Sequence, residues 1–139
     1  ARANLALNGQ LPAERAEWLE ADVFQALRDF RKEGRTFDLI VLDPPKFAPS
    51  AAHAERAAKA CKDINLLGFR LLNPGGLLMT YSCSGGVGLE LFQKIVAGAA
   101  IDAGRDARIV HRLAGAADHP VALNFPEAEY LKGLLVQVD

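Results

Sequence analysis

One apolar run of the chain stops at an acidic, proline-rich turn: Phe37-Asp38-Leu39-Ile40-Val41-Leu42-Asp43-Pro44-Pro45-Lys46-Phe47. Its β-favouring residues come without a regular polar alternation, which predicts a strand buried in a parallel sheet. The two prolines lack a backbone N–H, so they end the strand after Leu42. The carboxylate of Asp43 is therefore predicted to lie at the carboxyl end of this strand.

Upstream of this run, the pattern predicts helix, strand and helix. A short helix is expected over 1–8, where Ala and Leu favour it, and a short strand over 16–21. A second helix is expected over 23–33, with Asp22 as its N-cap. Gln25 stands three residues after the cap, so its side chain is expected to reach back as in a capping box.

Downstream, the last two predicted strands follow one another without room for a crossover helix. Such a pair forms an antiparallel ladder more easily than a parallel one. The spacing of apolar residues predicts these downstream elements: a helix over 53–72, a turn at Asn73-Pro74-Gly75-Gly76, a strand over 77–82, a helix over 89–103, and strands over 108–113 and 130–138.

These elements predict an α/β fold, with a mostly parallel sheet and an antiparallel final strand. A chain of 139 residues that is 50% hydrophobic suits one domain, spanning 1–139. Ligands of open sheets gather beyond the carboxyl ends of the strands. Asp22, the Asp43–Phe47 turn and Cys83 each follow a predicted strand, so they are the candidate site residues.

The composition excludes several classes of protein. A formal net charge of -1 gives no global sign of a nucleic-acid or membrane surface. No apolar stretch approaches the ~18 residues of a membrane span. The two cysteines and three histidines have no zinc-ligand spacing, so no metal site is expected, and a reducing cytoplasm fits the cysteine usage. The first residue is Ala rather than Met, which suggests a fragment of a longer protein.

The two cysteines suit different roles. Cys61 falls on the apolar side of the helix over 53–72, so it is expected to pack in the core. Cys83 ends a strand and precedes Gly85-Gly86 and a helix, whose amides would favour a thiolate. The alternative for Cys83 is a small buried apolar residue, as most free cysteines are.

Four segments together resemble the class I S-adenosylmethionine-dependent RNA methyltransferases, and most closely the bacterial large-subunit 23S ribosomal RNA cytosine-C5 methyltransferase family. They are Phe37–Phe47, Asn73–Gly76, Tyr81-Ser82-Cys83-Ser84, and the tail from His119 to Gly133. The resemblance implies the carboxyl-terminal portion of a Rossmann-like catalytic domain, S-adenosylmethionine as cofactor and ribosomal RNA as partner. The family's Gly-rich loop and first strands are not found in this sequence, so the chain alone is expected to be inactive.

The resemblance also implies roles for individual residues. Cys83 would be the nucleophile and Asp43 its electrostatic partner. Asp22 and Val23, with Asp43 and Pro44, would hold the cofactor, while Pro45, Lys46 and Phe47 would meet the RNA. Other roles stay open: Asp22 suffices as a helix cap, Lys46 as a solvated side chain and Phe47 as a core residue. Tyr130 and Lys132 could approach the target, although alternation along a strand explains both.

The sequence therefore predicts methyl transfer to C5 of a cytosine in ribosomal RNA. One alternative keeps the fold but changes the target to another nucleic-acid atom or a small molecule. Another alternative is a non-catalytic fragment that acts as a binding or assembly module. An open apolar edge at the strand over 37–42 also predicts homo-oligomers of the chain.

Overall fold

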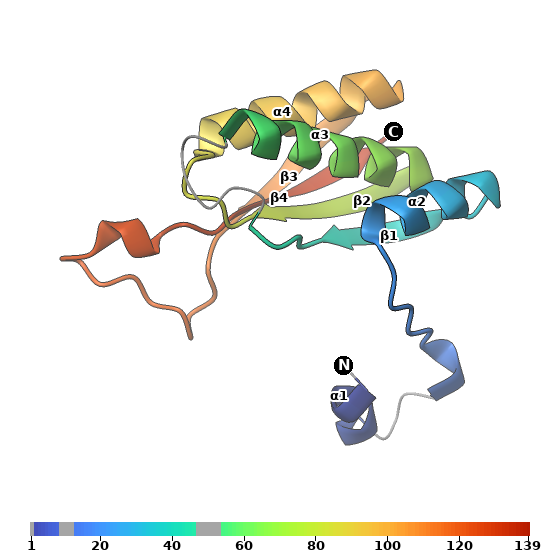
Figure 1. Ribbon diagram of the computed structural model, residues 1–139, viewed down its shortest axis with the longest axis horizontal. Helices are drawn as coiled ribbons and strands as arrows, with labels where there is room; N and C mark the ends of the chain where they lie inside the picture. The colour runs from blue at the N-terminus through green and yellow to red at the C-terminus, as the bar shows by residue number, and fades with distance from the viewer. Residues whose placement is uncertain (1, 9–12, 47–53) are drawn as a thin grey trace.

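The computed structural model describes residues 2–8, 13–46 and 54–139 (Figure 1). These residues form a four-stranded sheet in the order β1-β2-β4-β3, with helices over one of its faces. The strands are β1 (Phe37–Leu42), β2 (Leu72–Ser82), β3 (Ala107–Leu113) and β4 (Lys132–Val138). The helices are α1 (Arg2–Leu7), α2 (Val23–Lys32), α3 (Ala54–Leu71) and α4 (Leu89–Ala103), with short 3-10 turns at Ala13–Arg15 and Pro126–Ala128.

The sheet is mixed, as the sequence predicts. β1 and β2 are parallel, and their pairing runs to Leu42 opposite Thr80. β4 lies between β2 and β3 and is antiparallel to both. The predicted antiparallel pairing of the last two strands is confirmed, because the segment between β3 and β4 contains only a 3-10 turn within the described residues.

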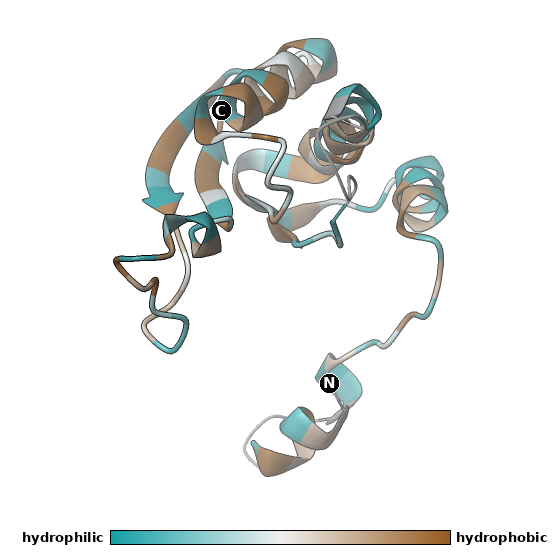
Figure 2. Ribbon diagram, turned by 60° about the vertical axis from the view of Figure 1, so that its left-hand side comes forward, coloured by the Kyte–Doolittle hydropathy of each residue, from teal (hydrophilic) through white to brown (hydrophobic). Residues whose placement is uncertain are grey.

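The core lies between the sheet and the helices α2, α3 and α4. Figure 2 shows the hydrophilic sides of α2 and α3 directed away from the sheet and their hydrophobic sides toward it. Burying these apolar stripes is what fixes the helices on the sheet. Within the described residues, no helix is long and apolar enough to cross a membrane. The largest fully buried apolar side chains are Ile64, Phe69, Leu71, Leu78, Phe92 and Leu134.

The expectation that β1 is buried is only partly right. Leu42 is buried on the helix side, but Leu39 and Val41 are 53% and 55% exposed. They alternate with Leu42 along the strand and so face the opposite side of the sheet. In the described residues that side has no helical cover, and β1 has no neighbour beyond β2 in the sheet.

Two predictions for the amino-terminal part are wrong. Residues 16–21 form no strand, because nothing in the described residues pairs with them, and Trp18 and Leu19 are exposed. An extended segment becomes a strand only when a neighbour takes its hydrogen bonds. Gln25 does not complete a capping box, since its Nε2 donates to the Asp29 carboxylate at 2.9 Å. An i,i+4 partner on the same helix face replaces the backbone cap.

The turn at Asn73-Pro74-Gly75-Gly76 is an insertion within β2. Leu72 pairs with Phe37 and Leu77 with Leu39, so the four turn residues lie opposite Asp38 alone. Gly75 has a φ of 77°, in the left-handed region that glycine tolerates best. Asn73 Nδ2 donates to Asp38 Oδ1 at 2.7 Å, which fastens the insertion to β1. The predicted helix stop is therefore confirmed, although the chain continues directly into the sheet.

Gly133 in β4 lies opposite an aromatic ring. It pairs with Tyr81 of β2 and with Leu113 of β3. A Cβ added at Gly133 would come within 2.6 Å of two Tyr81 ring carbons and 3.0 Å of Leu113 Cβ. The Tyr81 ring occupies the space that any other residue would need, so it is packed directly on the β4 backbone.

Gly133→Ala is therefore expected to destabilise the fold by about 1–3 kcal/mol, because the added methyl group must displace the Tyr81 ring. The midpoint of urea unfolding measures the effect. Gly98→Ala in α4 is the matched control, because the added Cβ would meet only the side chain of Lys62, at 3.6 Å. Removing a glycine from a helix interior should raise stability by about 0.5–1 kcal/mol. Equal midpoints for both variants would contradict this packing.

Candidate active site

The thiol of Cys83 and the Asp43-Pro44 turn lie together at one end of the sheet. Both follow the carboxyl ends of the parallel neighbours β1 and β2. Cys83 Sγ is 3.9 Å from the carbonyl oxygen of Pro44, a long contact to which the thiol donates. Cys83 is half-buried rather than sealed in the core. A thiol that is held by the neighbouring strand and still accessible can react with a bound molecule.

The residues of the proline-rich turn are mostly open to solvent. Asp43, Pro45 and Lys46 are exposed and Pro44 is half-buried, while Phe47 lies outside the described residues. Within the described part of the chain, no hydrogen bond or ion pair engages the Asp43 carboxylate. Its oxygens are therefore available to a ligand at the tip of β1.

Asp22 acts as the helix cap that the sequence predicts. Its Oδ1 accepts a hydrogen bond from the backbone N–H of Gln25 at 2.9 Å, at the start of α2. Asp22 and Val23 are both exposed, and the start of α2 lies at the same end of the sheet as the carboxyl end of β1 (Figure 1). The cap uses one carboxylate oxygen, so the other can still accept a hydrogen bond from a ligand.

Lys132, for which the sequence leaves open an approach to the target or simple strand alternation, lies at this end of the sheet. It begins β4, pairs with Ser82, and its Nζ donates to the carbonyl oxygen of Ser84 at 2.8 Å. Burial lowers the pKa of Lys132, while the nearby Cys83 acts in the opposite direction. Alternation along β4 predicts that the side chain at position 132 faces inward, and a lysine at an inward-facing position was the one sign in the sequence of a role for it.

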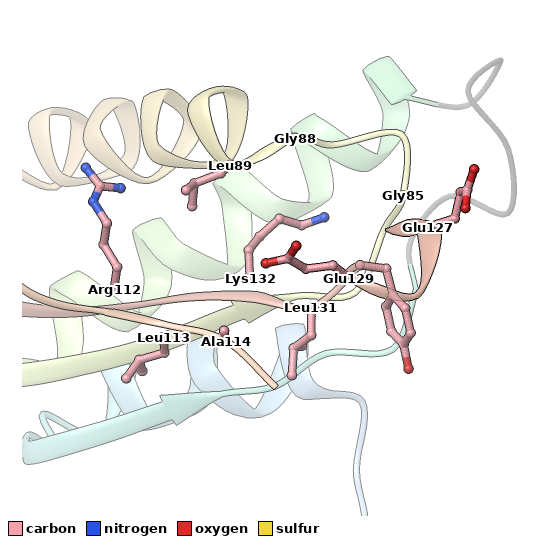
Figure 3. Close-up of a pocket in the computed structure, with 11 residues that line it drawn as sticks. Gly85, Gly88, Leu89, Arg112, Leu113, Ala114, Glu127, Glu129, Leu131 and Lys132 are labelled. Atoms are coloured by element: carbon pink, nitrogen blue, oxygen red, sulfur yellow. The ribbon is translucent and has the colours of Figure 1, made fainter. Parts of the chain in front are cut away.

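A pocket of about 550 Å³ lies beside Lys132, between the start of α4 and the β3–β4 connection. Figure 3 shows Lys132 and Arg112 on its walls, with Glu129 near Lys132. Arg112 donates to Gln93 of α4 at 2.8 Å, which holds that wall in place. The mixture of charged and apolar walls suits an amphipathic ligand. The lining residues are Gly85, Gly88, Leu89, Arg112, Leu113, Ala114, Glu127, Glu129, Tyr130, Leu131 and Lys132.

Cys61 has the structural role that the sequence predicts. It is 4% exposed in α3, and Asn65 Nδ2 donates to its carbonyl oxygen at 2.8 Å. Burial raises the pKa of the Cys61 thiol to about 11. The described residues contain no group of three or more His, Cys, Asp or Glu side chains placed to hold a metal ion.

Iodoacetamide at pH 8 is expected to modify Cys83 and to leave Cys61 unmodified in the folded chain. A thiol with a pKa of about 11 is only about 0.1% ionised at that pH, and core packing also blocks the reagent. Peptide mass spectrometry after brief labelling measures both sites. Labelling in urea is the control, in which both cysteines should react. Equal labelling of the two sites in the folded chain would contradict the assigned burial.

Two close relatives carry the same name, ribosomal RNA large subunit methyltransferase I. The protein of Shewanella amazonensis is 55% identical over 138 residues, and that of Tolumonas auensis is 55% identical over 137 residues. The match covers 99% of this chain but only 35% and 34% of the relatives, so the chain spans about a third of their length. These relatives agree with the resemblance seen in the motifs. No protein-family model matches the chain.

Solved structures share the fold. A proposed methyltransferase, SMU.776, crystallised with SAH, superposes with a TM-score of 0.69 at 21% identity, over 85% of this chain and 30% of its own. A methyltransferase homologue from Pyrococcus horikoshii superposes with a TM-score of 0.60 at 19% identity, over 98% of this chain and 48% of its own. The predicted α/β fold is therefore confirmed as part of a methyltransferase-type sheet.

Proposed function

We propose that this chain is part of an S-adenosylmethionine-dependent enzyme that methylates C5 of a cytosine in large-subunit ribosomal RNA. The observation that carries the proposal is the accessible Cys83 thiol, 3.9 Å from the Pro44 carbonyl at the end of two parallel strands. The names of relatives at 55% identity support the reaction class and the RNA. An activity on ribosomal RNA also fits the cytoplasmic location expected from the cysteine usage.

The thiol matters because C5 of cytosine is a poor nucleophile. In the proposed mechanism the Cys83 thiolate adds to C6, and the electron pair displaced from the C5–C6 double bond makes C5 nucleophilic. S-adenosylmethionine supplies the electrophilic methyl group. A base then removes the C5 proton, and the electrons of that C–H bond restore the double bond as the thiolate leaves. The cytosine must be unstacked for both faces to be reached.

The residues at the strand ends fit a cofactor that carries a positive charge and hydrogen-bond donors. The carboxylates of Asp22 and Asp43 are both exposed at this end of the sheet, and Asp43 has no protein partner within the described residues. A carboxylate favours nearby positive charge and accepts hydrogen bonds from amino groups. We assign Asp22 and Val23 to the adenine side and Asp43 with Pro44 to the reacting side.

The RNA side of the site comprises Pro45, Lys46 and Phe47. Pro45 and Lys46 are exposed, so the Lys46 ammonium can meet a phosphate without displacing protein contacts. The pocket beside Lys132 offers a further surface for nucleotides around the target. Because the chain spans about a third of its relatives, activity assays need a full-length protein that contains it.

Replacing Cys83 by Ala in that protein should reduce cytosine-C5 methylation at least about a thousandfold, because the covalent step is lost. Cys61→Ala is the matched control and should retain activity, since Cys61 is buried in α3. Methyl transfer to ribosomal RNA, followed by nucleoside mass spectrometry, measures rate and product together. RNA containing 5-fluorocytosine should trap an adduct only when Cys83 is present.

Three outcomes would favour another reading. Undiminished C5 methylation by Cys83→Ala would end the assignment of the nucleophile. Methylation of another atom, or of a small molecule, would keep the fold and change the target. A full-length protein that takes up no S-adenosylhomocysteine in calorimetry would favour a binding or assembly module.

For the chain on its own we propose self-association through β1. This strand lies at the edge of the described sheet and exposes Leu39 and Val41 at 53% and 55%. An open strand edge with apolar side chains offers unpaired backbone groups to a second copy. A copy that pairs there would take up the unpaired backbone groups of the edge and place its own side chains beside Leu39 and Val41.

Light scattering of the isolated chain should show its mass rising with concentration. Val41→Lys should lower the self-association, because a charge on an edge strand opposes pairing with another chain. Lys59→Ala is a suitable control, because Lys59 is exposed on α3, away from the sheet edge. A monodisperse monomer at high concentration would contradict this proposal.

A further inference from the structure

We infer that Lys132 is a positioning residue whose ammonium group stabilises the thiolate of Cys83. The inference rests on the proposed role of Cys83 as the nucleophile and deepens it. It assigns to the start of β4 a part in activating the thiol at the end of β2.

The sheet register brings Lys132 to the thiol. β4 is antiparallel to β2, so the first residue of β4 pairs with Ser82, the last residue of β2. The Lys132 side chain lies along the segment after β2, where its Nζ donates to the Ser84 carbonyl oxygen at 2.8 Å (Figure 3). Ser84 follows Cys83 directly, so this hydrogen bond fixes the ammonium group on the residue next to Cys83 in the chain.

The surroundings of Lys132 favour an interaction with an anion. The side chain is half-buried, and within the described residues no carboxylate lies within 4.0 Å of its Nζ. Burial lowers the pKa of Lys132, and Cys83 is the charged group that opposes this shift. A partly desolvated cation without a carboxylate gains most from an anion that forms nearby. The thiolate of Cys83 is such an anion.

Other titratable groups lie around the pair, and none of their carboxylates forms an ion pair with Lys132 within the described residues. Glu127, Glu129 and Tyr130 lie on the β3–β4 connection, and Arg112 on β3, all lining the pocket that Lys132 also lines. Arg112 is engaged by Gln93 of α4. Asp43, at the tip of the neighbouring β1, and Asp22, at the start of α2, are further exposed carboxylates at this end of the sheet. These carboxylates oppose a thiolate, whereas Arg112, the exposed Lys46 and Lys132 favour it, and Lys132 is the one held by a hydrogen bond to the residue after Cys83.

The inference is tested by the pH dependence of Cys83 alkylation in a full-length protein that contains this chain. Lys132→Met keeps most of the unbranched side chain and removes its charge, so the midpoint of the profile should rise by about one pH unit. At a fixed pH below both midpoints, alkylation should slow only about threefold, because a more basic thiolate is also more nucleophilic. Lys132→Arg should restore at least half of the shift.

Lys94→Met is the matched control, since Lys94 is exposed on α4 and paired with Glu90 at 2.7 Å. It should leave the midpoint unchanged. Lys132→Gln is a second neutral variant that shows whether the shift comes from charge rather than from the methionine. Urea unfolding of each variant checks that the fold is retained.

An unchanged midpoint in folded Lys132→Met and Lys132→Gln overturns the inference, as does a shift that Lys132→Arg fails to reduce. Alkylation requires neither RNA nor cofactor, so this result is independent of catalysis. Methylation that survives Cys83→Ala would instead overturn the proposed function. Adduct that accumulates on unmodified RNA in Lys132→Met, without a shifted midpoint, would assign Lys132 to proton removal from C5 and also overturn the inference.

Discussion

The parallel pairing of β1 and β2 is the constraint on which the candidate site depends. Two parallel strands end at the same edge of a sheet, so the Asp43-Pro44 turn and Cys83 are brought together although 39 residues separate Pro44 from Cys83. α3 makes this possible, because a parallel neighbour requires a crossover, and an 18-residue helix spans the length of the sheet. An antiparallel pair would have placed the carboxylate and the thiol at opposite ends.

The reversed direction of β4 adds a third polar group to the same edge. An antiparallel strand begins where its neighbour ends, so Lys132 starts beside Ser82 and reaches the carbonyl oxygen of Ser84. Gly133 then lets β4 pass close beneath the Tyr81 ring. The edge thus combines a carboxylate, a thiol and an ammonium from three strands, and only the mixed sheet direction provides all three.

Local patterns predicted what depends on neighbouring residues in the chain. The strand that ends at Asp43, the helix 89–103, the cap at Asp22 and the burial of Cys61 follow from periodicity, prolines and short side chains. Sequence patterns failed where the local structure depends on which partner a strand or a side chain finds in the fold. Residues 16–21 lack a strand to pair with in the described sheet. The Gln25 side chain donates a hydrogen bond to Asp29 instead of completing the cap. Leu39 lies on a face of the sheet without helical cover in the described residues. The position of Lys132 depends on a register between strands 50 residues apart, which composition and spacing do not encode.

The order of the strands in space has a consequence for synthesis on the ribosome. β4 is the last of the four strands to be translated, yet it lies between β2 and β3. Until Lys132–Val138 has left the exit tunnel, β3 has no partner and β2 has only β1 on one side. Between the translation of β3 and that of β4, the nascent chain therefore carries two strand edges that wait for the same partner, and unpaired strand edges favour aggregation.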